Sequence, residues 1–132
     1  LEGENYFRAE VSSPDRSADE ITEGCCVAAR AARLRGAAVT FFKYTSKAIT
    51  GDGCSEICCE LGHFYEETGD FEEAAVWYYN AAYETQPVLA LRSSEEEPLQ
   101  GLIRCYEQLG LPAQVRSYAE ELKHRQNEKT DN

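Results

Sequence analysis

The chain contains no methionine, and only His63 and His124 among its 132 residues are histidines. A natural reading frame starts with methionine, so we expect the sequence to be a piece of a longer protein or a processed product. Two histidines leave few candidates for a general base or a metal ligand.

Long apolar runs are also missing. No stretch approaches the roughly 18 to 20 consecutive apolar residues that a membrane-spanning helix requires. Residues 1–20 lack the basic start and the apolar run of a secretory signal peptide. The sequence therefore predicts no membrane insertion and a cytoplasmic location.

Positive charge is scarce as well. Against 24 acidic residues there are only 13 lysines and arginines, which gives a formal net charge of −11. Nucleic acids and anionic membranes both bind basic surfaces, so neither is expected as a partner.

Six cysteines are present, partly as the adjacent pairs Cys25-Cys26 and Cys58-Cys59. Neighbouring residues of a helix point to different faces, so these pairs do not form a simple disulfide framework. Without a secretory signal, reduced cysteines in a helical core are the favoured interpretation.

The most informative feature that the sequence does contain is an internal repeat. Its clearest unit is Ser55–Pro87, SEICCELGHFYEETGDFEEAAVWYYNAAYETQP. Gly69 stops a first helix in the left-handed conformation that glycine adopts easily. Asp70 then caps a second helix, with Glu73 three residues later. Apolar residues of the first helix recur three and four positions apart, as on one buried face. They are Ile57, Cys58, Leu61, Phe64 and Tyr65.

A second copy of this unit lies 33 residues earlier and a third lies 41 residues later, which leaves eight additional residues between Gln86 and Glu97. In the third copy, Pro98 and Pro112 both suit the first turn of a helix. In the first copy, Phe41 occupies the position of the small Ala74, a difference that bears on how closely those helices cross. The repeated positions are Cys25-Cys26, Gly36 and Ala48, then Cys58-Cys59, Leu61, Tyr65, Gly69 and Ala81, then Leu102, Tyr106 and Gly110.

This pattern resembles the tetratricopeptide (TPR) repeat, through Leu61-Gly62, Tyr65, Gly69-Asp70-Phe71, Ala74, Tyr78 and Ala81. The resemblance implies an all-α fold, a right-handed superhelix of TPR-like antiparallel helical hairpins, or α-solenoid. Residues 1–132 then form one domain. Its parts are the trailing helix of a partial repeat (1–14), repeat 1 (19–50), repeat 2 (53–87), an insert (88–97), repeat 3 (98–127) and a tail (128–132).

A narrower resemblance covers about residues 22–120. The segments SEICCELG, GDFEEAAVWYYNAA and PLQGLIRCYEQLG, in this order, look like the repeat region that follows the catalytic domain in some bacterial family 2 glycosyltransferases. This resemblance implies a larger bacterial protein whose catalytic domain lies outside this chain. The chain has neither an Asp-x-Asp motif nor the βαβ alternation of a nucleotide-sugar site, so we do not expect it to be an enzyme.

Cys54, Cys59 and His63 come closest to a chemical site, because their helical spacing lets some of them share a face. A tetrahedral zinc site, however, takes three or four ligands, often from separate turns. A Cys59–His63 pair lacks a third group that would orient the base. Packing in the core is the favoured interpretation, and neither a metal nor another cofactor is predicted. A metal or catalytic site remains the least favoured hypothesis.

In TPR proteins the first helix of each repeat lines a concave groove that binds peptides. The resemblance therefore implies a groove for a protein or peptide partner in this chain. The residues that it places there are Arg30, Arg33, His63, Glu66, Glu67, Arg104 and Gln108. TPR proteins that clamp a terminal carboxylate use Lys and Asn at several of these positions, and those residue types are missing, so this ligand is not expected.

Charge is divided unevenly between the first two repeats. Residues 25–50 carry five basic residues and no acid, whereas residues 51–91 carry nine acids and neither lysine nor arginine. Either the two repeats pair weakly along the stack, which is the favoured interpretation, or they let one copy bind another. The segment 87–97 leaves a similar choice, since its apolar start either packs on the repeats or forms a contact loop.

The sequence thus favours a non-catalytic module for protein interaction or scaffolding. The alternative is a homo-oligomerisation module, such as a homodimer, assembled through basic repeat 1 and acidic repeat 2.

Overall fold

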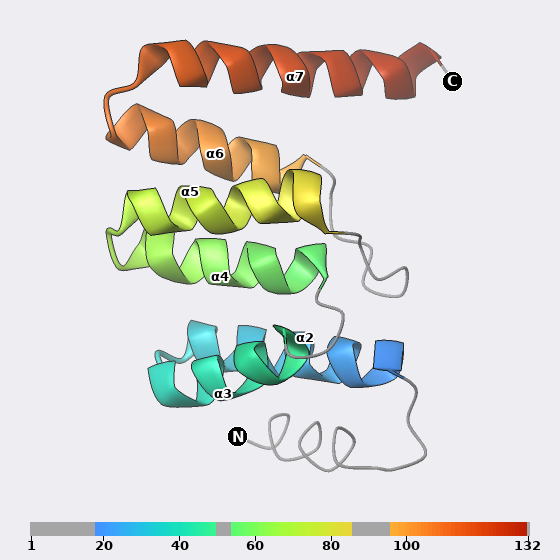
Figure 1. Cartoon of the computed structure of the whole chain (residues 1–132), viewed down its shortest axis with the longest axis vertical. Helices are drawn as coiled ribbons and strands as arrows, with labels where there is room; N and C mark the ends of the chain where they lie inside the picture. Colours follow the sequence, from blue (N-terminus) through green and yellow to red (C-terminus); the bar gives the residue numbers. More distant parts are fainter. Residues whose placement is uncertain (1–17, 50–53, 86–95, 132) are drawn as a thin grey trace.

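The computed structural model describes residues 18–49, 54–85 and 96–131, and every regular element in these ranges is helical (Figure 1). The predicted all-α class is confirmed for this part of the chain. A short π-helical turn, η1 (Asn80–Glu84), directly continues the α-helix α5. The α-helices are α2 (Ala18–Leu34), α3 (Ala38–Ile49), α4 (Ser55–Glu67), α5 (Phe71–Tyr79), α6 (Glu97–Gln108) and α7 (Pro112–Asp131).

The helices pack in sequential pairs. α2 packs on α3, α4 on α5 and α6 on α7, while α5 also packs on α6. In Figure 1, α4, α5, α6 and α7 follow one another along the long axis of the molecule, and α2 and α3 form its opposite end. None of the helices in the described ranges is both long and apolar enough to cross a bilayer.

Some predicted segments fall outside the described ranges. The predicted trailing helix 1–14 lies outside them, as do residues 88–95 of the predicted insert. Glu97, expected to end the insert, is already the first residue of α6, and α7 runs through most of the predicted tail to Asp131.

Each hairpin turns at a glycine with a positive φ. Gly69 follows α4 with a φ of 86°, and Gly36 and Gly110 follow α2 and α6 with φ of 75° and 71°. Beyond Gly69, the amide of Asp70 donates to the carbonyl of Tyr65 at 2.9 Å, which satisfies one of the last carbonyls of the helix. The predicted left-handed stop of α4 at Gly69 is confirmed.

The helices α5, α6 and α7 start with the cap or first-turn residues that the sequence predicts. The Asp70 carboxylate accepts a hydrogen bond from the amide of Glu73 at 3.3 Å, so Asp70 caps α5. Pro112 is the first residue of α7, where its missing amide proton costs no helical hydrogen bond. Pro98 lies likewise in the first turn of α6.

All six cysteines are free thiols in the interior. Burial raises the pKa of the Cys54 and Cys58 thiols to about 11 and that of Cys105 to about 12, so these thiols stay protonated at neutral pH. The Cys54 sulfur also caps α4, because it accepts a hydrogen bond from the amide of Ile57 at 3.5 Å. Within the described ranges, no three His, Cys, Asp or Glu side chains are placed to hold a metal ion. The predicted packing of the cysteines in the core is confirmed.

Small residues of α2 make room for aromatic side chains of its neighbours. Ala28 and Ala32 are fully buried in one cluster with Phe41 of α3. The Phe41 ring stacks on Phe64 of α4, with ring centroids 4.8 Å apart and an interplanar angle of 10°. The first hairpin therefore accommodates Phe41, where the second has Ala74, because α2 supplies alanines to the same cluster.

The Tyr78 ring fills the space between α4, α5 and α6. It is fully buried, and a Cβ atom added at Gly62 of α4 would lie 2.7 Å from it. A Cβ atom added at Gly101 of α6 would lie 2.6 Å from it. A closely packed ring has no room to withdraw from such a contact. The two glycines therefore allow three helices to close around one aromatic side chain.

We predict that Gly101→Ala destabilises the fold by about 1–3 kcal/mol, because the new Cβ overlaps the Tyr78 ring. The sign is informative, since alanine in a helix interior otherwise stabilises by about 1 kcal/mol relative to glycine. Urea unfolding measures the change. The control is Gln100→Ala at the exposed neighbouring position, with an expected change below about 0.5 kcal/mol. A Gly101→Ala protein as stable as the unmodified chain would contradict the packing around Tyr78.

Candidate functional site

Six of the seven residues predicted to line a groove meet in two polar networks, all on the first helices of the hairpins. They are Arg30 and Arg33 from α2, His63, Glu66 and Glu67 from α4, and Arg104 from α6. The seventh, Gln108, is exposed at the end of α6 and lies outside both networks as the structure describes them.

The first network joins α2 to α4 and centres on Glu60. Arg30 Nε donates to Oε1 of Glu60 at 2.7 Å, Arg33 Nε donates to Oε2 at 2.8 Å, and Arg33 also pairs with Glu67. Glu60 is only 1% exposed, whereas Arg30 and Glu67 reach solvent. A carboxylate buried so deeply needs its guanidinium partners to offset the loss of hydration. The network therefore fixes α2 against α4.

The second network consists of His63, Glu66, Tyr78, Glu97 and Arg104, and we call it the Tyr78 network. Arg104 holds Glu66 through two nitrogens, with Nε–Oε2 and Nη2–Oε1 distances of 2.8 and 3.0 Å. The Tyr78 hydroxyl lies 2.6 Å from Oε1 of Glu66 and 2.8 Å from Nδ1 of His63. His63 Nε2 in turn lies 2.6 Å from Oε1 of Glu97. Side chains from α4, α5 and α6 are thereby linked in a row.

These contacts change the acidity of the network's members. Burial raises the pKa of the Tyr78 phenol far above its ordinary value, and the neighbouring Glu66 carboxylate adds to this effect. Burial also acts to raise the pKa of Glu66, but the hydrogen bonds from Arg104 and Tyr78 outweigh it, so that the pKa is lowered. The hydrogen bond with His63 lowers the pKa of Glu97. At neutral pH Tyr78 is thus a neutral phenol, and both carboxyl groups are ionised.

The side chains of the predicted groove therefore satisfy one another. A charged ligand at this face would compete with ion pairs that are already formed. The least favoured hypothesis paired Cys59 with His63, but both ring nitrogens of His63 are engaged by Tyr78 and Glu97. Burial raises the pKa of the Cys59 thiol, which opposes the thiolate that a nucleophile requires.

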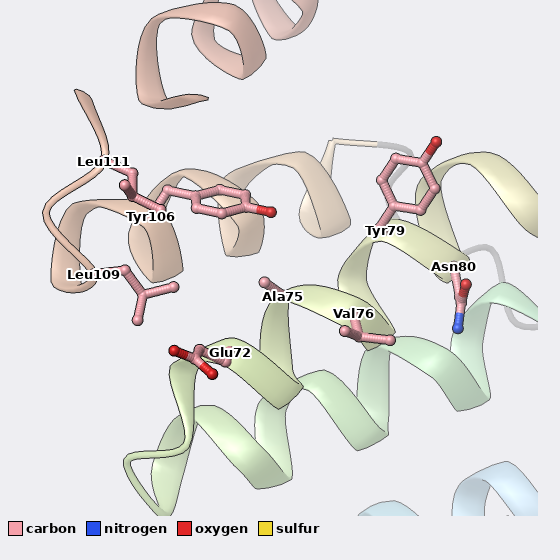
Figure 2. Close-up of a pocket in the computed structure, with 8 residues that line it drawn as sticks. All are labelled: Glu72, Ala75, Val76, Tyr79, Asn80, Tyr106, Leu109 and Leu111. Carbon is pink, nitrogen blue, oxygen red and sulfur yellow. The ribbon is translucent and has the colours of Figure 1, made fainter. Parts of the chain in front are cut away.

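A separate, largely apolar groove lies between α5 and the end of α6 (Figure 2). Its volume is about 600 Å³, within the range of about 300–1,000 Å³ that is typical of ligand pockets. Val76, Tyr79 and Leu111 are 53%, 42% and 41% exposed, so their apolar surface is accessible. We call this feature the α5–α6 groove. It is lined mainly by Glu72, Val76, Tyr79, Tyr106, Leu109 and Leu111.

The α5–α6 groove was not predicted from the sequence, because the repeat positions in α5, Ala74 and Tyr78, mark only the face that packs in the core. The helix has two apolar faces, with Ala74 and Tyr78 directed into the core and Val76 and Tyr79 exposed at the groove. Tyr83 of η1 continues the exposed face, and its ring centroid lies 4.9 Å from that of Tyr79. The spacing of Val76, Tyr79 and Tyr83, three and then four residues, is a helical stripe and carries the signal that was overlooked.

We predict that Glu60→Ala destabilises the fold by about 1–3 kcal/mol, because Arg33 loses its buried partner and keeps only the exposed Glu67. The matched control is Glu67→Ala, which removes an exposed partner of the same Arg33 and is expected to cost less than about 1 kcal/mol. Urea unfolding of both variants measures the difference. Equal costs would show that the burial of Glu60 does not determine its contribution.

The lowered pKa values of Glu66 and Glu97 predict sensitivity to acid. Such a carboxyl group stabilises the fold above its unfolded pKa, near 4.5, and this contribution is lost as the pH falls through the lower, folded pKa. We expect the free energy of unfolding to decline below about pH 4.5 in urea titrations at a series of pH values. Glu66→Gln is expected to flatten this decline, and Glu120→Gln, an exposed position of α7, to preserve it. Identical pH profiles for the two variants would refute the contribution of Glu66.

Comparison with known proteins identifies no relative: no protein-family model, no curated protein and no solved structure matches the chain.

Proposed function

We propose that this chain is a non-catalytic protein-interaction module, a TPR-like right-handed superhelix that binds an amphipathic helix of a protein partner in the α5–α6 groove. The observation that carries this proposal is the exposed apolar wall formed by Val76 and Tyr79, opposite Tyr106 and Leu109 (Figure 2). A helix that lays apolar side chains into such a groove is a common mode of peptide recognition.

Charge narrows the chemistry of the partner. The helix α5 and its extension η1 (residues 71–84) include three acids, Glu72, Glu73 and Glu84, and neither lysine nor arginine, and Glu72 stands in the wall of the groove itself. Acidic surroundings attract a basic partner and disfavour an acidic one. The partner helix therefore carries an apolar stripe flanked by lysine or arginine.

The TPR-like superhelix is supported by the common construction of the three hairpins. Each turns at a positive-φ glycine, and these glycines, Gly36, Gly69 and Gly110, recur at intervals of 33 and 41 residues. The first helices α2, α4 and α6 are joined by the two polar networks. The resemblance to the region beside the catalytic domain of bacterial family 2 glycosyltransferases supports a scaffold role within a larger protein.

A second copy of the chain is the other candidate occupant, and the exposed side of α3 favours it. Val39 is 87% exposed there, and the basic residues Lys43 and Lys47 are exposed on the same helix. An apolar anchor with basic neighbours is the chemistry that the acidic groove selects. Docking of α3 into the groove of another copy would make the module self-associating.

Selection of a displayed library of helical peptides on the folded domain tests the main proposal. We expect enriched peptides to carry basic residues beside an apolar stripe, and to bind more weakly as salt is added. Val76→Glu is expected to lower their affinity by at least about tenfold, equivalent to about 1.4 kcal/mol, because it places a charge in the groove wall. The matched control is Val39→Glu, the same change on α3, which is expected to leave the affinity unchanged.

Peptides that bind the Val76→Glu variant as tightly as the unmodified domain would overturn the proposal. Light scattering at low and high salt examines the second candidate with the same two variants. Self-association through α3 and the groove predicts that each variant is monomeric, as is the unmodified protein at high salt. A monomer under all conditions would exclude it.

A further inference from the structure

Beside the two contacts of Arg104 with Glu66, the Tyr78 network contains three contacts, Tyr78–Glu66, Tyr78–His63 and His63–Glu97, and each requires a hydrogen of its own. The Tyr78 hydroxyl has one proton but lies within hydrogen-bond distance of both Oε1 of Glu66 and Nδ1 of His63. Glu66 is an ionised carboxylate held by Arg104, so it can only accept. The phenol therefore donates to Glu66, and Nδ1 of His63 supplies the hydrogen for its contact with the phenol oxygen.

The other ring nitrogen of His63 is constrained in the same way. Nε2 lies 2.6 Å from Oε1 of Glu97, and a glutamate carboxyl group is ionised at neutral pH and able only to accept. Nε2 therefore donates as well. A neutral imidazole has a single N–H and cannot donate from both nitrogens.

We propose that His63 is an imidazolium, with a proton on each ring nitrogen. Both protons are needed for the contacts that link α6 to α4 and α5. Loss of one proton as the pH rises therefore changes the α5–α6 groove. The protonation state follows from the hydrogen-bond geometry. The response of the groove rests in addition on the function proposed above.

The surroundings of His63 support the charged form. Glu66 is neutralised by its two contacts with Arg104, which leaves Glu97 as the carboxylate that balances the imidazole. A nearby opposite charge favours an ionised histidine. The titratable and charged groups around the ring are Cys59 and Glu66 from α4, Tyr78 from α5, Glu97 and Arg104 from α6, and Arg30 of α2 beyond Glu97.

Loss of one proton from His63 leaves three contacts with only two hydrogens, so one contact breaks whichever tautomer forms. The row runs from α4 and α5 to Glu97, the first residue of α6. The same helices form the groove, since Tyr78 lies between Val76 and Tyr79 in α5. Whichever contact breaks, α4 loses a link to α5 or to α6, the two helices that supply the groove walls.

Nitrogen-15 NMR of the histidine rings at about pH 7.5 tests the protonation state directly, because a free histidine is mostly neutral there. The chain offers one internal reference, His124, which pairs with Glu128 on the exposed side of α7. We expect both ring nitrogens of His63 to show the shifts of protonated nitrogen. A neutral tautomer of His63 would overturn the proposal.

Glu97→Gln tests the carboxylate that holds the second proton, because glutamine keeps an accepting oxygen but loses the charge. We expect His63 to be neutral in this variant at about pH 7.5. The matched control is Glu128→Gln, the same change beside His124, which is expected to leave the His63 resonances in place. An imidazolium that persists in the Glu97→Gln variant would refute the role of Glu97.

Amide hydrogen exchange tests, without any ligand, whether the His63–Glu97 contact holds α6 against α4. After correction for intrinsic rates, we expect protection of Glu97–Gln108 to fall at least about threefold between about pH 6.5 and about pH 9, relative to α2 and α3. Unchanged relative protection would overturn the pH response. Affinity of a selected peptide is expected to fall over the same range. Should no peptide bind the groove, the proposed function fails, and the NMR and exchange results still decide the state of His63 and α6.

Discussion

The close approach of three helices around the Tyr78 ring is the constraint on which the rest of the structure depends. Gly62 and Gly101 leave no side chain between this ring and the backbones of α4 and α6. Because α5 is held from both sides, the second and third hairpins form one packed unit, and the phenol oxygen is carried to Glu66 and His63. A phenylalanine would fill the same space but leave those polar groups without their partner. Packing and polar contacts thus depend on one residue.

The ion pairs of Glu60 and Glu66 join neighbouring hairpins. Glu60 of the second hairpin is neutralised by Arg30 and Arg33 of the first, and Glu66 of the second pairs with Arg104 of the third. Buried ion pairs contribute modestly to stability, because desolvation offsets much of their attraction, but an unmatched buried charge is costly. The pairs therefore act mainly on specificity, since a different neighbour would leave Glu60 uncompensated. Part of the uneven charge division in the sequence has this internal role.

Features that depend on local geometry could be predicted from the sequence. Gly69 and Asp70 act through backbone conformation and capping within a few residues, and both were predicted correctly. The burial of Glu60 could not be predicted, because its arginine partners lie 30 and 27 residues away and no local pattern points to them. The resemblance placed charged residues of α2, α4 and α6 on one face but could not show that they bind one another. The groove was not predicted, because the repeat positions of α5, Ala74 and Tyr78, lie on its buried face, whereas Val76 and Tyr79 lie on the exposed one.

The two faces of α5 are mechanically connected. The helix has nine residues, and successive residues turn by about 100°, so Tyr78 points into the core while Val76 and Tyr79 reach the groove. A rigid helix this short cannot move Tyr78 without moving its neighbours. An exposed apolar stripe promotes aggregation unless it binds something, and here it lies on the helix that carries the buried Tyr78 side chain. A groove wall fixed in this way loses little conformational entropy on binding, which favours recognition of a preformed helix over that of a flexible segment.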